Sequence, residues 1–575
     1  MGLPSYKQKF AEAVEGALIR NGFPSPGLDI LEGLIASPPS VEKGDLSLPV
    51  FKILPAGKGP VPFALHLASS LHPDGVFHRF QAMGPYLNAF IDPSAYHSSI
   101  LMEAEAAPPL PGKEAPLVIV EYASPNTNKP LHAGHLRNIA LAESVIRLLQ
   151  HEGKRVFRTQ IINDRGVHIC KSMLAYQKWG NGKTPESEKM KSDHFVGRYY
   201  VEFSARAEQD PLLEEEAQAM LVKWEQGNPE IRALWKKMNA WAEKGLFETY
   251  DKVGATFDEN YYESDIYQKG KEAVRQGMEK GLFTTAENGA VIAPLEKKYG
   301  LPDKPLLRGD GTTLYFTQDI YLALQRFTDH PEAERIIYVV GSEQEMHFKQ
   351  LFAILDLLGY PQGKKCYHLG YGLLTLPTGK MSSRQGTVVN ADDLIAELEA
   401  DARAEYAKRS PELAPAEVDR RSRVVAMAAL KFFLVKQDAQ KELVFIPHES
   451  LSFDGPTGPY LLYTLARMRS IQRKTEQQPQ KQKAGLLVTE KEKELIALLS
   501  KKNEIIASAL RHFSPHVLAH YLLEVANTFN TYYHETKIIQ ENKELESARL
   551  ALLHSLDAVL EEGLYLLGIE PLDEM

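Results

Sequence analysis

The feature that most restricts the fold of this chain is an apolar strand, a helix and a second apolar strand in close succession. The first strand is PLVIVEY (116–122), and the second is VFRTQII (156–162). Between them, apolar residues at helical spacing run from Gly134 to Gln150, and Gly153 closes the helix. A crossover of this length joins parallel strands, because antiparallel neighbours need only a short turn. The segment therefore predicts a parallel βαβ unit.

The pattern returns in the second half of the chain. RIIYVV (335–340) is an apolar strand, a helix is expected over 345–358, and KCYHLGYGLL (365–374) is the next strand. A mainly helical stretch around 180–300 separates the two halves, and it includes the charged run LLEEEAQAMLVKWEQ. We therefore expect an α/β Rossmann-like domain with one parallel sheet and a helical insertion.

Prolines and composition mark the limits of this domain. PPLPG (108–112) blocks helix and sheet alike. Before it, the helical run FAEAVEGALI (10–19) and the strand-like GDLSLPVFKI (44–53) predict an α+β domain. We predict four parts, namely an N-terminal domain, the α/β domain, a connecting helical region and an all-α C-terminal domain, spanning residues 1–106, 113–393, 394–445 and 446–575.

Cysteine content and hydropathy exclude several classes of protein. The only cysteines, Cys170 and Cys366, are too few for a disulfide framework or a Cys-based zinc site. No apolar run approaches the roughly 18 residues of a membrane span, and the first residues lack a signal-peptide core. We expect a protein of the reducing cytoplasm. The net charge of −9 does not argue against RNA binding, which needs only a local basic face.

A histidine pair stands where the first strand passes into its helix. His132, Ala133, Gly134 and His135 follow the loop SPNTNKPL. Ligands bind at the carboxyl ends of parallel strands, and a helix N-terminus presents free N–H groups to phosphate. Gly134 permits close approach of a flat base, and histidines can donate hydrogen bonds to phosphate oxygens as negative charge builds there. The alternatives are two ordinary polar residues or a metal site, although no neighbouring Cys or acidic run completes the latter.

A basic loop follows the last apolar strand. Lys380, Met381, Ser382, Ser383 and Arg384 stand shortly before a glycine. A loop with Lys and Arg can close over a triphosphate and stabilise charge on the departing pyrophosphate. By itself, such a loop is more often solvated surface.

Together the two motifs resemble the HIGH and KMSKS signatures of class I aminoacyl-tRNA synthetases, in the same order and structural context. The resemblance implies an ATP site that contains His132, Gly134, His135, Lys380, Met381 and Ser382, in which the two histidines and the lysine are catalytic. Ser383 stands where the family has its second lysine, and Lys129 is our candidate for the missing charge. An unchanged rate of adenylate formation after Lys129→Ala would remove that hypothesis.

Six blocks in order resemble arginyl-tRNA synthetases in particular. They are VEYASPNTNKPLHAGHLRN, IINDRGVHICKSM, TLYFTQDIYLA, IIYVVGSEQEMHFKQ, GKMSSRQGTVV and GPTGPYLLYTLARMRSI. The match runs through most of the chain and is weakest around 180–250. It implies activation of L-arginine by ATP, with Mg²⁺ on the triphosphate, and transfer to the terminal adenosine of tRNA(Arg).

The same blocks can assemble a pocket for a guanidinium. This group has five donors in one plane and is best matched by fixed carboxylates. Glu121 ends the first strand, and Tyr315 and Asp319 are four residues apart, so they would share a face of one helical turn. Lysine would leave part of such an acceptor array unpaired. By resemblance, the arginine-binding residues are Glu121, Asn126, Tyr315, Asp319 and Gln344, with His347 on the ATP side.

The C-terminal helical region offers a basic helix for RNA. Tyr460, Tyr463, Arg467 and Arg469 follow a Gly-Pro pair. Arginines suit phosphate contacts and tyrosines can stack on splayed bases, although an ordinary solvated helix has the same composition. The resemblance makes this region the anticodon-binding domain, and the N-terminal domain the one that contacts the tRNA elbow. It also favours a monomer.

Three other functions are open at this point. Another class I synthetase, such as the cysteine or methionine enzyme, is disfavoured by the absence of Cys clusters and by the pair Glu121 and Asp319. A small-molecule adenylyltransferase of the pantothenate synthetase kind shares the H-x-G-H loop, but it would not need a basic, all-helical C-terminal third. A non-catalytic RNA-binding or scaffold protein is disfavoured by the intact histidines and Lys380.

Overall fold

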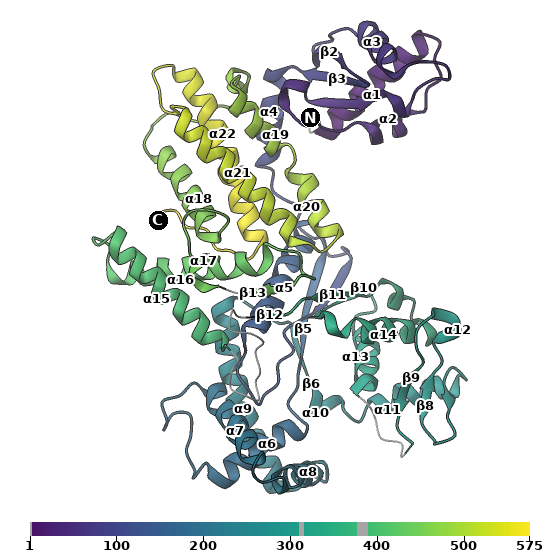
Figure 1. Cartoon of the computed structure of the whole chain (residues 1–575), viewed down its shortest axis with the longest axis vertical. Coiled ribbons are helices and arrows are strands. Elements are labelled where there is room, and N and C mark those ends of the chain that lie inside the picture. The colour runs from purple at the N-terminus through teal and green to yellow at the C-terminus, as the bar shows by residue number, and fades with distance from the viewer. Residues whose placement is uncertain (1–2, 310–314, 376–388, 445) are drawn as a thin grey trace.

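The computed structural model describes residues 3–309, 315–375, 389–444 and 446–575. The N-terminal domain and the helical insertion lie at opposite ends of the long axis, with the main sheet between them (Figure 1). The C-terminal helices lie beside the sheet, toward the N-terminal domain (Figure 1). The N-terminal domain and the C-terminal helices therefore lie toward the same end of the molecule, opposite the insertion (Figure 1).

The N-terminal domain packs helices against an antiparallel sheet of order β1-β3-β2. Phe10, Val14 and Leu18 lie on one face of the first helix and are completely buried, as their helical spacing predicts. The elements are α1 (Leu3–Arg20), α2 (Leu28–Leu34), β1 (Leu46–Pro49), α3 (Pro60–Ser70), β2 (Phe77–Met83), β3 (Tyr86–Ile91) and α4 (Pro93–Ala104).

The central sheet has five parallel strands in the order β11-β10-β4-β5-β6. They are β4 (Leu117–Glu121), β5 (Arg155–Ile162), β6 (Glu259–Tyr262), β10 (Ala333–Gly341) and β11 (Tyr367–Tyr371). Helix α5 (Ala133–His151) makes the first crossover, as predicted. The chain builds from β4 through β5 to β6, and it then returns to the other side of β4 with β10 and β11. The order in which strands are added to the sheet therefore changes side between β4 and β10, although the strands themselves stay parallel. Open α/β sheets bind ligands at such a switch point.

The insertion is mainly helical, but part of it belongs to the main sheet. Helices α6 (Val167–Trp179), α7 (Ser192–Ala207), α8 (Leu212–Glu225) and α9 (Pro229–Val253) share a core of their own. Strand β6 then pairs with β5 at the sheet edge, which the sequence did not predict because ENYY is not an apolar run. A small antiparallel sheet was also missed, made of β7 (Thr284–Thr285), β8 (Val291–Ala293) and β9 (Lys304–Leu307).

Short and medium helices complete the α/β domain. They are α10 (Glu263–Ile266), α11 (Gly270–Glu279), α12 (Glu296–Tyr299), α13 (Tyr315–Asp329) and α14 (Glu345–Leu357). Helix α14 lies between β10 and β11 in the chain, as the sequence predicts, and forms the second crossover.

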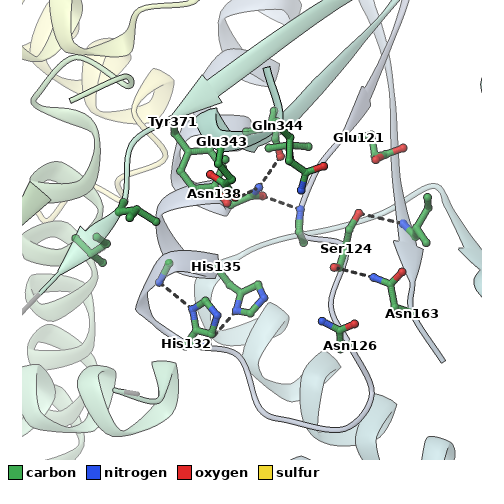
Figure 2. A pocket seen from close by; sticks show the side chains of 18 of the residues that line it. Glu121, Ser124, Asn126, His132, His135, Asn138, Asn163, Glu343, Gln344 and Tyr371 are labelled. Atoms are coloured by element: carbon green, nitrogen blue, oxygen red, sulfur yellow. Dashed lines mark hydrogen bonds between the residues drawn. The ribbon is translucent and has the colours of Figure 1, made fainter. Parts of the chain in front are cut away.

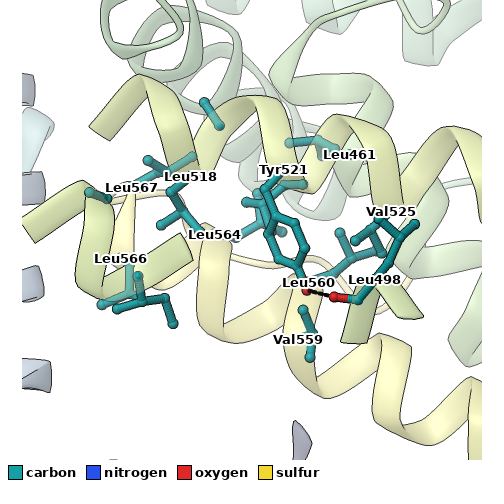
Figure 3. Close-up of a cluster of buried hydrophobic side chains, with 14 of the residues drawn as sticks. Leu461, Leu498, Leu518, Tyr521, Val525, Val559, Leu560, Leu564, Leu566 and Leu567 are labelled. Atoms are coloured by element: carbon teal, nitrogen blue, oxygen red, sulfur yellow. Dashed lines mark hydrogen bonds between the residues drawn. The ribbon is translucent and has the colours of Figure 1, made fainter. Parts of the chain in front are cut away.

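The C-terminal part is almost entirely helical. Two short strands, β12 (Leu374–Thr375) and β13 (Leu443–Val444), pair at its base. Its helices are α15 (Ala391–Arg409), α16 (Pro415–Val435), α17 (Pro447–Ser450), α18 (Gly458–Arg473), α19 (Glu490–Leu499), α20 (Lys502–Arg511), α21 (Pro515–Glu535) and α22 (Lys543–Leu566). Leu461, Leu518 and Leu564 meet in its core, where Tyr521 Oη donates to Leu498 O at 3.0 Å (Figure 3). Across the described ranges, none of the helices combines the length and apolar character that a bilayer span requires.

Candidate active site

A cavity of about 580 Å³ opens at the switch point of the sheet. Its walls come from the carboxyl ends of β4 and β10, the start of α5 and the start of α14 (Figure 2). The residues predicted to bind ATP or arginine that line it are Glu121, Asn126, His132, Gly134, His135, Asp319, Gln344 and His347. The fold thus brings described residues from both halves of the predicted site into one cavity.

The turn after β4 has an unusual backbone conformation. Ala123 and Ser124 have φ angles of 66° and 46°, in the left-handed region that residues with a side chain seldom adopt. Asn138 on α5 fixes this turn, because its Oδ1 accepts from Ala123 N at 2.6 Å and its Nδ2 donates to Val339 O at 2.6 Å (Figure 2). Asn138 thereby joins the ends of the two strands on either side of the switch point.

Backbone hydrogen bonds orient both histidines of the first motif. His132 Nδ1 accepts from Gly134 N at 3.2 Å, and His135 Nδ1 accepts from His132 N at 3.0 Å. Because each Nδ1 accepts, the proton of each neutral ring is on Nε2. A Cβ at position 134 would lie 3.0 Å from Cε1 of His132. A larger residue there would crowd the His132 ring in the position that its hydrogen bond fixes, so glycine suits this position for a reason that the sequence alone did not suggest.

Burial keeps both rings neutral near pH 7. It lowers the pKa of His132 to about 4, and the nearby charge of Lys129 adds to the effect. The pKa of His135 is lowered well below its ordinary value, first by burial and then by His132 and Lys129. A neutral ring with its proton on Nε2 is still a hydrogen-bond donor, as a phosphate oxygen requires. Lys129 is not among the described residues that line the cavity, so its influence there is through its charge.

Two carboxylates lie in another part of the cavity. Glu121 stands across it from His132 and His135 (Figure 2). It is 7% exposed, and its Oε2 accepts from Nη1 of Arg326, which is completely buried. Burial raises the pKa of Glu121, and the charge of Arg326 opposes this. Asp319 Oδ2 accepts from His347 Nε2 at 2.7 Å.

Two of the predicted site residues have protein partners that the sequence did not indicate. Glu121, predicted to bind arginine, is paired with Arg326 from the same helix as Asp319. His347 was predicted on the ATP side. The structure places it against Asp319, because α14 packs against α13 there.

The second motif can be followed only from its described flanks. Lys380, Met381 and Ser382 lie outside the described residues, as does the side chain of Tyr315, although Tyr315 begins α13. After the motif, the chain returns to the first one, because Ala133 N donates to Val389 O at 3.2 Å and Ala391 N donates to Leu131 O at 2.9 Å. The backbone flanking one motif is thus hydrogen-bonded to the other.

Comparison with known proteins shows which family has this architecture. The model for tRNA synthetases class I (R), catalytic domain, matches residues 98–446, and the model for the DALR anticodon binding domain matches residues 461–575. The arginine–tRNA ligase of Parabacteroides distasonis is 42% identical over 93% of this chain and 94% of that protein. The chain belongs to the arginyl-tRNA synthetase family.

Other relatives of this synthetase agree with that assignment. The arginine–tRNA ligase of Treponema denticola is 43% identical over 94% of each chain. The solved arginyl-tRNA synthetase of Thermus thermophilus is 28% identical, has a TM-score of 0.78 and covers 99% of this chain and 100% of that chain. The resemblance and the fold class predicted from the sequence are therefore confirmed. The roles of single site residues stay predictions.

The residues of this synthetase that were predicted to contact RNA lie on α18 and differ in how accessible they are. Tyr463 is 37% exposed, and the Arg467 guanidinium lies 4.6 Å from its ring centroid. Tyr460 is tied to α21, since its Oη donates to Asn527 Oδ1 at 2.7 Å. Arg469 is already paired with carboxylates, namely Asp557 at 3.1 Å, Glu561 at 2.8 Å and Asp573 at 2.6 Å. Arg469 thus has an internal role that the predicted phosphate contact did not foresee.

Sequence reasoning missed several residues that shape the cavity. Asn138 carried a usable signal, because it lies three residues after His135 and would share its helix face. Asn163 had none; its Nδ2 donates to Ser124 O at 3.2 Å across the ends of neighbouring strands (Figure 2). Arg326 was also missed, because an arginine within a helical run usually faces solvent.

Proposed function

We propose that this chain activates L-arginine with ATP and transfers the arginyl group to tRNA(Arg). The observation that carries the proposal is the division of one cavity into a part with two carboxylates, Glu121 and Asp319, and a part with two neutral histidines. The first part suits a guanidinium and the second suits a phosphate chain. The reacting carboxylate and the α-phosphate would meet between them.

The proposed first step is attack of the arginine carboxylate on the α-phosphorus of ATP. A bond forms between a carboxylate oxygen and phosphorus, the bond to the β-phosphate oxygen breaks, and pyrophosphate leaves. His132 and His135 would donate from Nε2 to phosphate oxygens as charge develops. Asn126 and Gln344 line the cavity and would hold the amino and carboxylate groups of arginine. No residue needs to form a covalent intermediate, because positioning and charge stabilisation suffice.

Mg²⁺ would enter with the nucleotide. It is usually held by phosphate oxygens together with one or two carboxylates. Glu343 lines the cavity in the 3-10 turn (Ser342–Gln344) that precedes α14 and is exposed, so it is the side chain that we propose for this contact. Lys129 and Lys380 are the proposed cations for the remaining phosphate charge.

In the proposed second step, the 2′-hydroxyl of the terminal adenosine attacks the arginyl carbonyl carbon and AMP leaves. Tyr463, Arg467 and Tyr533 support RNA binding in the C-terminal domain, because the arginine lies between the two exposed rings, at 4.6 and 5.2 Å from their centroids. Aromatic rings and a guanidinium plane are the groups on which unpaired bases stack. We also propose an elbow contact by the N-terminal domain, a monomeric state and a cytoplasmic location.

Pyrophosphate exchange into ATP tests this function. The assay would use the full chain, each amino acid in turn, and reactions with and without tRNA(Arg). Exchange that depends on arginine is expected, and it should fall at least about 100-fold in His135→Ala, which removes a donor to the developing charge. Exchange with another amino acid, or none with arginine in the presence of tRNA(Arg), would overturn the proposal.

A further inference from the structure

A buried arginine of the protein stands behind the proposed arginine pocket. Arg326 lies on α13, seven residues after Asp319, so the two side chains share one side of the helix. Arg326 is completely buried, and its Nη1 donates to Glu121 Oε2. Asp319 and Glu121 line the cavity, whereas Arg326 does not. The carboxylate of Glu121 therefore has the cavity on one side and an internal guanidinium on the other.

The Arg326 guanidinium is poorly satisfied for a group in the core. Nε and Nη2 of Arg326 have no hydrogen-bond partner among the described residues, and neither does the buried Oη of Tyr338 nearby. The guanidinium of Arg326 also lies 4.9 Å from the ring centroid of Tyr261. A buried ion pair with so few additional hydrogen bonds contributes little net stability compared with an apolar pair. Stability alone thus gives a weak reason for an arginine at this position.

A second buried arginine shows what a structural role looks like in this protein. Arg137 is also completely buried, but its guanidinium donates to a set of backbone carbonyls. Two of them are Ala439 O at 2.9 Å and Lys441 O at 2.7 Å. Arg137 thereby ties α5 to the segment before β13. Arg326 has no such set, and its charged partner is the carboxylate at the cavity.

We propose that Arg326 is a positioning residue that holds Glu121 ionised and oriented toward the side chain of the amino-acid substrate. Without a cation behind it, a carboxylate this deeply buried would take up a proton and would become a poor partner for a guanidinium. With Arg326 in place, Glu121 can accept from the substrate while its other side is fixed. The inference rests on the proposed function, because it assumes that Glu121 contacts arginine.

Steady-state pyrophosphate exchange at several pH values tests the inference in three variants of the full chain. Arg326→Met replaces the unbranched stem of the side chain with an apolar chain of about the same length and removes the charged guanidinium. Arg326→Lys keeps the charge and loses the planar fork, and Arg137→Met is the matched buried control. The groups that face the Glu121–Arg326 pair from neighbouring elements are Asp319 and His347 at the cavity, Tyr338 from β10 and Tyr261 from β6.

In Arg326→Met, we expect the KM for arginine to rise about 30-fold or more. It should also fall steeply as pH increases between about 6 and 9, since Glu121 would then regain its charge only at high pH. The wild type, Arg137→Met and the KM for ATP should show no such pH dependence. Arg326→Lys should lie between the wild type and Arg326→Met.

A double variant, Glu121→Gln with Arg326→Met, separates positioning from stability. It removes both members of the ion pair, so its unfolding midpoint should recover relative to Arg326→Met, whereas the KM for arginine should stay high. An arginine KM that is unchanged and independent of pH in Arg326→Met would overturn the inference. If that variant does not fold, the same result in Arg326→Lys would overturn it. Absence of arginine-dependent exchange in the wild type would instead refute the proposed function.

Discussion

Two buried carboxylates of the protein have opposite surroundings. Glu121, at the cavity, accepts from one charged partner, Arg326. Asp392, at the start of α15, uses both oxygens. Its Oδ2 accepts from Lys191 at 2.8 Å, Thr249 at 3.0 Å and His194 at 3.2 Å, and its Oδ1 accepts from Lys252 at 2.7 Å.

The difference shows in the protonation behaviour of the two groups. The net shift of the pKa of Glu121 is upward, with burial as the largest cause and Arg326 opposing it. Burial also acts to raise the pKa of Asp392, but hydrogen bonds from His194, Lys191 and Lys252 outweigh it, and the net shift is downward. A carboxylate that is surrounded by donors has no capacity left for a ligand. One that keeps an open side at a cavity does.

Asp392 therefore has a structural role, and we call Asp392 and its four donors the hub. Its donors come from the start of α7 and from α9, so it fastens the helical insertion to α15. Asp193, His194 and Asp392 have the residue types of a metal site and lie close together. However, Lys191 and Lys252 already balance the charge of the two aspartates.

The largest expected effect is on stability, at the hub. Asp392→Asn should lower the free energy of unfolding by about 3–5 kcal/mol, because a buried network of charged donors loses its central carboxylate. Lys252 would have no counter-charge, and Lys191 would keep only Asp193, 2.9 Å away. The KM for arginine should not change in the folded protein. Urea denaturation followed by tryptophan fluorescence measures the free energy of unfolding, and pyrophosphate exchange measures the KM for arginine.

Asp393→Asn is the matched control for this variant. Asp393 stands next to Asp392 on the same helical turn but is exposed, so its loss should change stability by no more than about 0.5 kcal/mol. Equal denaturation curves for the two variants would contradict the hub.

A smaller effect, on catalysis and not on stability, is expected at the cavity. Asp319→Asn should lower kcat/KM for arginine by roughly 10- to 150-fold, the value of a lost charge-assisted hydrogen bond of about 1.5–3 kcal/mol. Its urea midpoint should match that of the wild type, because the Asp319 side chain is 31% exposed. The exposed Asp329 on the same helix offers a control, and an equal loss of activity in Asp329→Asn would sink the assignment.

The smallest effect concerns the pH dependence of the hub. The hydrogen bond to Asp392 raises the pKa of His194, and burial opposes it. A histidine whose pKa is higher in the folded state stabilises the fold below about pH 6.5, and this contribution is lost as pH rises through the folded-state pKa. The difference in urea midpoint between the wild type and His194→Gln should therefore shrink from about pH 6 to pH 8. A difference that stays constant would mean that His194 does not bind its proton more tightly in the folded protein.

The sequence predicted the fold best where apolar periodicity was strong. β4, β5 and β10 are apolar runs, and the helices that join them have clear apolar faces, so the parallel sheet could be derived. β6 could not, because Glu259 and Asn260 at its start have no apolar pattern and the strand forms only by pairing with β5. The small sheet of β7, β8 and β9 has strands of two to four residues, too short for periodicity to be seen.

For the site, the sequence predicted where the functional side chains lie better than it predicted which side chains they pair with. Glu121, Asp319 and the two histidines were expected in one place from strand ends and helix starts, and they line one cavity. Their partners were not predictable, because Arg326 and Arg469 look like ordinary helical surface charges until tertiary packing brings Glu121 or the acidic residues of α22 to them. Local sequence does not record which elements will meet.

The packing of α4 bears on the distance between the two domains that are proposed to bind RNA. Although α4 is the last helix of the N-terminal domain, Ser98 Oγ donates to Lys481 O at 2.7 Å and Lys502 Nζ donates to Ala104 O at 3.0 Å. The N-terminal domain is thus anchored to the C-terminal helices as well as joined through the proline-rich linker. If both domains hold RNA as proposed, these contacts would fix the distance between the site for the elbow and the site for the anticodon. A misfolded transfer RNA with a different distance between these two regions could then bind only one of the two domains.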